Sequence, residues 1–590
     1  MADPQVVLGS RVRAALGAAF GADYADADPV IRPSSFADFQ SNVALPLAQE
    51  LGAQLGKKIP PRDVANDIVA HLDVAGISEP PTVSGPGFVN FKLTDAWIAA
   101  EATQVGRDPR IGAPLAEHPQ TIIVEYSSPN IAKEMHVGHL RTTIVGDAIA
   151  RVLEYAGHNV IRDNHVGDWG TQFGMLIEYL FDVGEDAPEA QLLRTDPNTF
   201  YQSARAKFHS DSEFKYRAQK RVVKLQSGDD PATQALWDEM MELSRQYLND
   251  TYTLLGVTLT DDDIRGESFY SDLLPGVVDD LTAKGLAVES DGALVVFPPG
   301  FTGRDGAALP VIIRKRDGGY NYSTTDLATV RYRVDKVNCD RAIYVVGSDQ
   351  TLHFRMVFAV ARMAGWLPRD ARFEHAPIGM VQGADGGRLR TRAGDNIKLG
   401  DLLAEGIEQA RAVLDEVEGM DEATKDAIAQ DVGIGAIKYA DLSTARDSAY
   451  IFDWKKMLAL RGNTGPYLQY ATARIRSIFR RANLDPAAIL GSAGPQASIV
   501  ITEQAERGLA LQLLGFGSVI EQVADTAEPH RLGGYVFETA SLFTTFYEQC
   551  PVLKADNEAT RSSRLVLCAA TLRVLTASLG LLGVPLPERM

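Results

Sequence analysis

The stretch from residue 121 to residue 162 constrains the fold most, because it predicts a strand, a helix and a second strand in direct succession. Residues 121–126 form an apolar run typical of a strand buried inside a parallel sheet. Apolar residues then recur at helical spacing over 140–152, which predicts a helix that ends near Gly157. Residues 159–162 predict the second strand. Such a βαβ unit indicates a Rossmann-like, doubly wound α/β domain.

Further strand patterns predict the rest of this domain, which we place at residues 113–398. Strands are expected at 311–313, 342–346 and 377–381, and they would form the second half of the sheet. Residues from about 180 to 290 are polar and helix-like. This region is therefore predicted to be an insertion between the two halves of the sheet.

The regions on either side of this domain have different patterns. Residues 1–112 predict an α+β module, with leucines at helical spacing over 45–55 and a short strand at 87–91. Residues 399–440 predict a connecting helical segment, and residues 441–590 predict an all-α domain.

Composition excludes several classes of protein. Hydrophobic residues make up 45% of the chain and charged residues 23%, which excludes intrinsic disorder and a collagen-like fibre. The net charge is −19. A generally basic surface is therefore excluded, and any contact with nucleic acid must use a local basic face.

The sequence also predicts where the protein works. Its three cysteines lie far apart and form no disulfide framework, and no leader-like segment is present near Met1, so we expect a cytoplasmic protein. The most membrane-like stretch, residues 565–586, contains Arg573 near its middle. Burying that charge in a bilayer costs about 2.5–3.5 kcal/mol, so we predict a buried core helix and no membrane contact.

The strongest chemical signal is His136-Val137-Gly138-His139, which follows the first strand and opens the helix. Helix N-terminal N–H groups attract phosphate oxygens, and a glycine there lets a ligand approach the backbone. Two imidazoles on the same turn can donate hydrogen bonds to charge that develops on phosphate. This pattern predicts a site for a nucleoside triphosphate. A zinc-binding histidine pair and two merely structural histidines are the alternatives.

The motif also resembles the His-Ile-Gly-His signature of the class I aminoacyl-tRNA synthetases. The longer run from Ser127 to Arg141 looks like the arginyl-tRNA synthetase family in particular. Residues 165–174, residues 432–439 and the C-terminal residues 587–590 look like the same family. The resemblance covers nearly the whole chain, and the order of these segments makes it specific.

The resemblance implies a reaction in two steps. The arginine carboxylate attacks the α-phosphate of ATP, bound with Mg²⁺, and the arginyl group then passes from the adenylate to tRNA. AMP and pyrophosphate are released, and the first step would require tRNA. The implied ATP contacts are His136, Gly138, His139, Gly167 and Met380. We expect no metal site built from protein ligands.

The second signature of the class, Lys-Met-Ser-Lys, is altered in this chain. The matching segment, residues 388–394, offers Arg388, Arg390 and Arg392 as a phosphate clamp, but it contains no lysine. Some members of the family share this departure and use a lysine before the histidine motif, where Lys133 stands here. The alternative is that these basic side chains are merely solvated.

A pocket for arginine needs carboxylates and other acceptors around the guanidinium. Tyr322 and Asp326 are four residues apart and would share a face if that stretch is helical. A surface pair is the alternative. The resemblance implies that Asp326 or Glu125 faces the guanidinium. The residues implied for the pocket are Glu125, Ser128, Pro129, Asn130, His139, Tyr322, Asp326 and Gln350.

Contact with tRNA is expected at the C-terminal domain. Residues 436–590 carry 16 Lys and Arg against 14 Asp and Glu, although the whole chain is acidic. Arginines beside aromatic residues suit phosphate contact and base stacking, although a solvated helix face and core packing of Tyr547 are alternatives. The residues predicted to contact tRNA are Tyr467, Tyr470, Arg474, Arg476, Arg480, Tyr547 and Met590. The resemblance also implies that the N-terminal module meets tRNA.

The sequence therefore predicts an arginine–tRNA ligase that works as a monomer on arginine, ATP and tRNA. Other class I synthetases are the nearest alternative, but a neutral amino acid would leave Asp326 and Glu125 buried without a partner. A tRNA-binding regulator without catalysis and an α/β zinc hydrolase are the remaining alternatives. The intact histidine motif and the lack of a third zinc ligand argue against these two.

Overall fold

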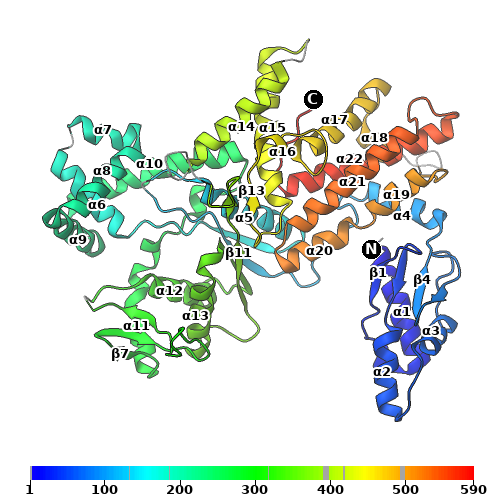
Figure 1. Cartoon of the computed structure of the whole chain (residues 1–590), viewed down its shortest axis with the longest axis horizontal. Coiled ribbons are helices and arrows are strands. Elements are labelled where there is room, and N and C mark those ends of the chain that lie inside the picture. Colours follow the sequence, from blue (N-terminus) through cyan, green and yellow to red (C-terminus); the bar gives the residue numbers. More distant parts are fainter. Residues whose placement is uncertain are drawn as a thin grey trace.

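The computed structural model describes residues 3–131, 133–184, 186–316, 318–389, 397–415, 419–491 and 498–590. Figure 1 shows these parts spread along one long axis. An α/β domain occupies the middle, helices of the insertion lie at one end, and a small N-terminal module lies at the other. The C-terminal helices lie between the α/β domain and the N-terminal module.

A four-stranded parallel sheet forms the centre of the α/β domain, in the order β11-β10-β5-β6. Its chain order reverses between β5 and β10, and ligands bind at such a switch point in doubly wound sheets. The predicted βαβ unit is confirmed as β5-α5-β6. The elements are β5 (Thr121–Glu125), α5 (Val137–Tyr155), β6 (Asn159–Asp163), β10 (Arg341–Gly347), α13 (Thr351–Met363) and β11 (Arg372–Ile378).

The strand expected at residues 311–313 exists but lies in another sheet, so its assignment to the parallel sheet was wrong. β9 (Val311–Arg314) pairs antiparallel with β8 (Ala293–Val296), which pairs antiparallel with β7 (Val288–Ser290). Val311 and Ile313 are buried, whereas Ile312 is 37% exposed. A short apolar run predicts a strand but does not reveal which sheet the strand joins.

The segment between β6 and β10 is mostly helical, as expected for an insertion. The first helices gather at one end of the molecule, and α10 leads back toward the parallel sheet (Figure 1). They are α6 (Thr171–Val183), α7 (Pro188–Thr195), α8 (Pro197–Ser210), α9 (Ser212–Ser227) and α10 (Pro231–Leu255). The small sheet, α11 (Leu274–Ala283) and α12 (Tyr322–Asp335) follow.

The N-terminal module is an α+β unit, as predicted. Its antiparallel sheet has the order β1-β2-β4-β3. Arg507 of the C-terminal helices attaches this module, because its guanidinium donates to both carboxylate oxygens of Asp38 at 2.8 Å and to Asp95 at 2.8 Å. The elements are α1 (Pro4–Phe20), β1 (Ile31–Pro33), β2 (Phe39–Ser41), α2 (Ala44–Leu55), α3 (Pro61–Ala70), β3 (Thr82–Ser84), β4 (Phe88–Phe91) and α4 (Asp95–Arg107).

The described residues of the C-terminal third form helices and one two-residue strand. β13 (Tyr450–Ile451) pairs with β12 (Val381–Gln382) and so reaches back to the α/β domain. The helices are α14 (Leu399–Asp415), α15 (Glu422–Leu442), α16 (Trp454–Met457), α17 (Gly465–Ala482), α18 (Pro486–Gly491), α19 (Gln504–Leu513), α20 (Phe516–Thr526), α21 (His530–Gln549) and α22 (Glu558–Leu581).

Among the described residues, α22 is the one helix that is long and apolar enough to cross a membrane. The structure buries 72% of its most apolar window inside the protein. Arg573 donates from Nη1 to the carbonyl oxygen of Gly106 at 3.1 Å, which gives the charged side chain a partner. The helix therefore has the predicted place in the core of the helical domain.

The contact between α5 and the end of β5 generates a prediction about stability. A Cβ at Gly146 would lie 2.1 Å from Cβ of Tyr126, whereas a Cβ at the helical Gly534 would have open space. Gly146→Ala is expected to cost about 1–3 kcal/mol through overpacking. Thermal melting should show a lower Tm for Gly146→Ala and an unchanged or slightly higher Tm for the control Gly534→Ala. Equal melting of the two variants would contradict this packing.

Candidate active site

The turn between β5 and α5 has a strained backbone that its neighbours hold in place. Ser127 and Ser128 have φ values of 68° and 47°, in the left-handed region that side chains other than glycine rarely adopt. Ser127 Oγ lies 2.8 Å from the hydroxyl of Tyr252, and the backbone N–H of Ser128 donates to Asn164 Oδ1 at 3.0 Å. The turn therefore aims the following residues across the carboxyl edge of the sheet.

The two histidines of the signature stand on the first turn of α5 with a defined orientation. His136 Nδ1 accepts from the backbone N–H of Gly138 at 3.0 Å, and His139 Nδ1 accepts from the backbone N–H of His136 at 3.1 Å. A ring nitrogen that accepts a hydrogen bond carries no proton, so each neutral ring keeps its proton on Nε2. The stacked rings, with centroids 4.0 Å apart, thus provide two Nε2–H donors.

Both imidazoles are neutral at neutral pH. Burial lowers the pKa of His139 to about 3, and the nearby charges of His136 and Lys133 act in the same direction. Burial also lowers the pKa of His136, with further contributions from Lys133 and Arg388. Neutral rings with fixed tautomers can donate hydrogen bonds to an anionic ligand without first losing or gaining a proton.

Two glycines allow close packing beside these rings. A Cβ at Gly138 would lie 2.8 Å from Cε1 of His136 and would displace the ring from its stacked position. A Cβ at Gly167 would lie 2.3 Å from Oδ1 of Asn130, and Gly167 also forms a backbone bridge with Asn130. Its N–H donates to the carbonyl of Pro129 at 3.1 Å. The predicted residues Pro129, Asn130 and Gly167 therefore form one packed unit.

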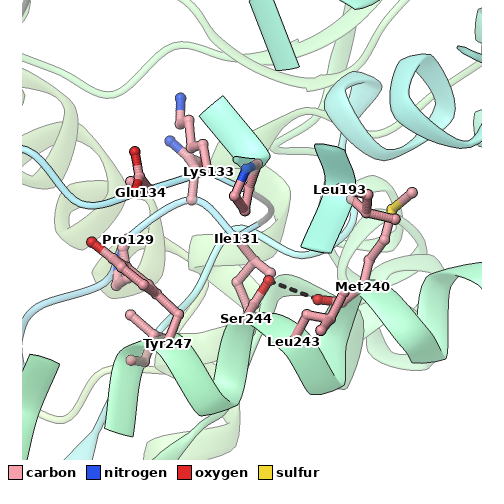
Figure 2. Close-up of a pocket in the computed structure, with 12 residues that line it drawn as sticks. Pro129, Ile131, Lys133, Glu134, Leu193, Met240, Leu243, Ser244 and Tyr247 are labelled. Atoms are coloured by element: carbon pink, nitrogen blue, oxygen red, sulfur yellow. Dashed lines mark hydrogen bonds between the residues drawn. The ribbon is translucent and has the colours of Figure 1, made fainter. Parts of the chain in front are cut away.

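Lys133 lies on the loop before the histidines and faces the insertion. Its Nζ lies 5.2 Å from the centroid of the Tyr201 ring on α8, and burial together with the charge of Arg205 lowers its pKa. Figure 2 shows Lys133 on one wall of a pocket whose opposite wall is α10, with Met240, Leu243 and Tyr247. This mostly apolar pocket has a volume of about 470 Å³, including its open mouth.

The predicted phosphate clamp is described only at its start. Arg388 is exposed, forms a backbone bridge with Gln382, and lies close enough to His136 to lower the pKa of that ring. Arg390 and Arg392 lie outside the described residues. Downstream of them, Lys398 forms a backbone bridge with His136. The described residues on the two sides of the segment, Arg388 and Lys398, therefore both lie near His136.

Tyr322 and Asp326 lie on one helix, α12, as their spacing suggested. Asp326 Oδ2 lies 2.5 Å from Nε2 of His353 on α13, and the Tyr322 ring packs 4.8 Å from the His353 ring. Tyr322 is 58% exposed, and Gln350 is exposed immediately before α13. The structure brings Tyr322 and Asp326 together through His353. Sequence reasoning missed His353, although it lies only three residues after Gln350.

The structure places Glu125 against an arginine of the chain itself. Glu125 Oε2 accepts from Nη2 of Arg333 at 2.5 Å, and Asp163 Oδ2 accepts from the same nitrogen at 3.0 Å. Burial raises the pKa of Glu125, and the charge of Arg333 opposes that shift. Glu125 or Asp326 was expected to face the guanidinium of the substrate. Of these two, Glu125 binds the guanidinium of Arg333 through its Oε2. Sequence reasoning missed Arg333, because no motif marks it and it lies 208 residues from its partner.

The remaining predicted residues of this site lie around the same edge. Ser128 is half-buried in the strained turn, and Pro129 is buried beside it. Met380 follows β11 and is 49% exposed. Its carbonyl accepts from the N–H of Tyr450 at 3.4 Å, so its position is fixed by the pairing of β12 with β13.

The residues predicted to contact tRNA have two kinds of environment. The guanidinium of Arg474 lies between two exposed aromatic rings, 4.6 Å from the centroid of Tyr470 and 4.9 Å from that of Tyr547. Tyr467 instead points into the domain, where its hydroxyl lies 2.9 Å from Thr544 Oγ1. Tyr470, Arg474 and Tyr547 therefore form an accessible cationic and aromatic surface.

The C-terminal segment occupies the other predicted arginines. Arg476 donates to the carbonyl of Pro587 at 2.8 Å, and Arg480 donates to the carbonyl of Glu588 at 3.1 Å. Met590 packs against the cluster formed by α14 and α15. The last residues of the chain thus lie between α17 and α15, at the rim of the cationic helix.

Three family models match the chain in order. Residues 7–93 match the arginyl tRNA synthetase N terminal domain, residues 105–454 match the catalytic domain of tRNA synthetases class I (R), and residues 468–590 match the DALR anticodon binding domain. The catalytic-domain match alone covers more than half of the chain.

Relatives and solved structures agree with these models over the full length. The arginine–tRNA ligase of Thermobifida fusca is 58% identical over 591 residues, and that of Synechococcus elongatus is 48% identical over 601, each with complete coverage of both chains. The arginyl-tRNA synthetase structure from Plasmodium falciparum has a TM-score of 0.81 at 28% identity, covering 99% of each chain. The structure from Thermus thermophilus has a TM-score of 0.78 at 25% identity, covering 100% of each chain.

The low pKa of His139 generates a prediction about stability at acid pH. Between the ordinary histidine pKa of 6.5 and the folded value of about 3, the unfolded chain binds a proton that the folded chain does not. Stability is therefore lost as pH falls below 6.5, and His139→Asn removes that contribution. Between pH 7 and 5 the Tm of the unchanged protein should fall more steeply than that of His139→Asn. The exposed His118 provides the control, since His118→Asn should retain the original slope; parallel curves for all three would contradict the assignment.

Proposed function

The chain belongs to the arginyl-tRNA synthetases of class I, which attach arginine to tRNA, and from this premise we propose how its own residues carry out the reaction. The observation that carries the proposal is the stacked pair of imidazoles at the N-terminus of α5. Their two Nε2–H donors stand where the helix adds positive potential, at the switch point of the sheet.

The first step needs positioning and electrostatic stabilisation rather than a protein nucleophile. The carboxylate oxygen of arginine attacks the α-phosphorus of ATP, a new oxygen–phosphorus bond forms, and the bond to pyrophosphate breaks. His136 and His139 donate hydrogen bonds to the phosphate oxygens, on which charge increases in the transition state. Gly138 leaves room for the ring of His136 and Gly167 leaves room for the side chain of Asn130, so both glycines keep these groups in place beside the nucleotide. The exposed Met380 provides an apolar contact for the base.

Lys133 and the basic segment take the place of the usual lysine-containing loop. Lys133 and Arg388 both lie close enough to His136 for their charges to lower its pKa, which supports their placement beside the triphosphate. Arg390 and Arg392 would add guanidinium groups to the same clamp. The groups gathered here are hydrogen-bond donors and cations, which suit phosphate oxygens. Mg²⁺ therefore enters coordinated by ATP, where it neutralises phosphate charge.

The arginine pocket lies between α12 and the ends of β5 and β10. Asp326 faces the guanidinium, with Tyr322 and Gln350 at the rim, and Glu125 contributes its Oε1, which accepts no hydrogen bond from a described residue. Ser128, Pro129 and Asn130 line the end where His139 and the α-carboxylate meet. Lysine has one point charge in place of a planar fork, so it would leave acceptors without a partner.

The surface formed by Tyr470, Arg474 and Tyr547 contacts tRNA. An arginine between two exposed aromatic rings can bind phosphate while the rings stack on unpaired bases. Arg476 and Arg480 extend this surface along α17, Met590 adds to it beside α14 and α15, and Tyr467 supports it from within. The N-terminal module, residues 1–112, makes a second contact, and the all-α domain, residues 441–590, recognises the anticodon.

We further propose that the enzyme works as a monomer in the cytoplasm. Cys339, Cys550 and Cys568 are buried free thiols, as expected in a reducing compartment.

The role of His136 in the transition state predicts a selective loss of rate. His136→Ala should lower kcat about 10²–10³-fold, the usual cost of removing one such donor, while KM for ATP changes much less. Steady-state aminoacylation with tRNA measures both constants. The exposed His118 supplies a matched control, His118→Ala, with unchanged kinetics. An unchanged kcat in His136→Ala would refute the role.

The role of Asp326 predicts a selective loss of arginine affinity. Asp326→Asn keeps the shape but removes the charge that pairs with the guanidinium, so KM for arginine should rise by about 10–100-fold. KM for ATP should stay near its original value. Saturation by arginine at the original concentration would instead make Asp326 a structural residue.

A further inference from the structure

Arg333 is a buried guanidinium at the carboxyl edge of the parallel sheet. Its side chain is 1% exposed, and its Nη2 donates to both Glu125 and Asp163. The guanidinium carbon lies 4.7 Å from the centroid of the Tyr344 ring. Among the described residues, its Nε and Nη1 have no hydrogen-bond acceptor. The group is therefore held by two carboxylates on one edge and by an aromatic face.

The three partners of Arg333 form one straight row across the sheet. Glu125 is the register partner of Asp163 on β6 and also of Tyr344 on β10. The row therefore crosses three adjacent strands at the level where β5 and β6 end. A single side chain from α12 contacts all three members, so it fixes the last turns of α12 against this row.

The same helix carries the proposed arginine-binding residues. Asp326 precedes Arg333 by seven residues and Tyr322 precedes it by eleven, so the three share one face of α12. Asp326 also lies close enough to Tyr344 to influence the ionisation of its hydroxyl. The distance from Asp326 to Glu125 is consequently set by where Arg333 attaches α12 to the strand ends.

Two features make this attachment specific to an arginine. Nη2 alone bonds the two carboxylates, and the rest of the guanidinium packs beside the Tyr344 ring. A lysine ammonium could bond the carboxylates, but it is too compact to cover the ring as well. Removing the guanidinium would leave Glu125 and Asp163 as two buried negative groups at adjacent strand ends, free to repel each other or to capture the substrate in the wrong place.

We propose that Arg333 is a positioning residue for arginine recognition: it holds Glu125 and α12 so that Glu125 Oε1 and Asp326 face one substrate guanidinium. This inference rests on the proposed function, because it takes Asp326 and Glu125 as the arginine pocket. Arg333 itself touches no substrate. By occupying Glu125 Oε2 and Asp163, it also prevents a second guanidinium from binding between the two strand ends.

The test compares Arg333→Lys and Arg333→Met in steady-state aminoacylation, with arginine varied at saturating ATP and tRNA. Both variants should raise KM for arginine about tenfold or more, since small displacements of binding groups have large effects, while KM for ATP stays within about twofold. Arg331 lies on the same helix with a side chain 37% exposed, so Arg331→Met is the matched control and should change neither constant.

A double variant separates positioning from charge balance and covers the case in which Arg333→Met folds poorly. Arg333→Met with Asp163→Asn removes one buried negative charge together with its partner, so its Tm should recover relative to Arg333→Met. KM for arginine should remain raised. Recovery of both would show that Arg333 only balances charge, and an unchanged KM for arginine in folded single variants would equally overturn the inference.

Parallel measurement of Asp326→Asn distinguishes a wrong assignment of the arginine pocket from a wrong role for Arg333. If Asp326→Asn raises KM for arginine and the Arg333 variants do not, the pocket is supported and the inference about Arg333 is wrong. If neither residue affects KM for arginine, the pocket assignment itself fails. A rise in KM for ATP equal to that for arginine would show general damage to the domain and would also overturn the inference.

Discussion

Two hydrogen bonds from backbone N–H groups to imidazoles determine how this site works. They fix the tautomers of His136 and His139 and leave both Nε2–H groups as donors. The rings remain neutral because burial and neighbouring cations lower their pKa values. Because His136 is the N-cap of α5, the position of these donors depends on the strained turn after β5 and on the packing of α5 beneath the sheet edge.

Buried ion pairs connect this helix to the parts that must act with it. Arg141, two residues after His139, pairs with Asp441 of α15 at 2.5 Å and donates to the carbonyl of Ser448 at 2.7 Å. Ser448 lies two residues before β13, whose partner β12 leads into the basic segment. That segment returns to the backbone of His136 through Lys398. The described residues on either side of the basic segment are thus attached to the helix that begins with the histidine motif.

Local patterns in the sequence predicted the βαβ unit, the turn with His136 and His139, and the helix with Tyr322 and Asp326. Contacts between distant residues were beyond such patterns. The ion pair of Glu125 with Arg333 joins residues 208 apart, and His353 meets Asp326 only after α13 packs beside α12. The pattern at residues 311–313 likewise predicted a strand but not the sheet that it joins, because an apolar pattern indicates burial and does not identify the neighbouring strand. The sequence therefore predicted a set of residues for the arginine pocket, but not how their side chains are arranged or which residues hold them.

Arginine and ATP are expected to meet at one sheet edge, with the phosphates against the two imidazoles. A crystal structure with arginine and a non-hydrolysable ATP analogue would show both ligands at once. We expect an arginine carboxylate oxygen about 3–3.5 Å from the α-phosphorus, and both Nε2 atoms within hydrogen-bonding distance of phosphate oxygens. The guanidinium should lie against Asp326. Arginine and nucleotide bound in separate cavities, or phosphates remote from His136 and His139, would contradict this arrangement.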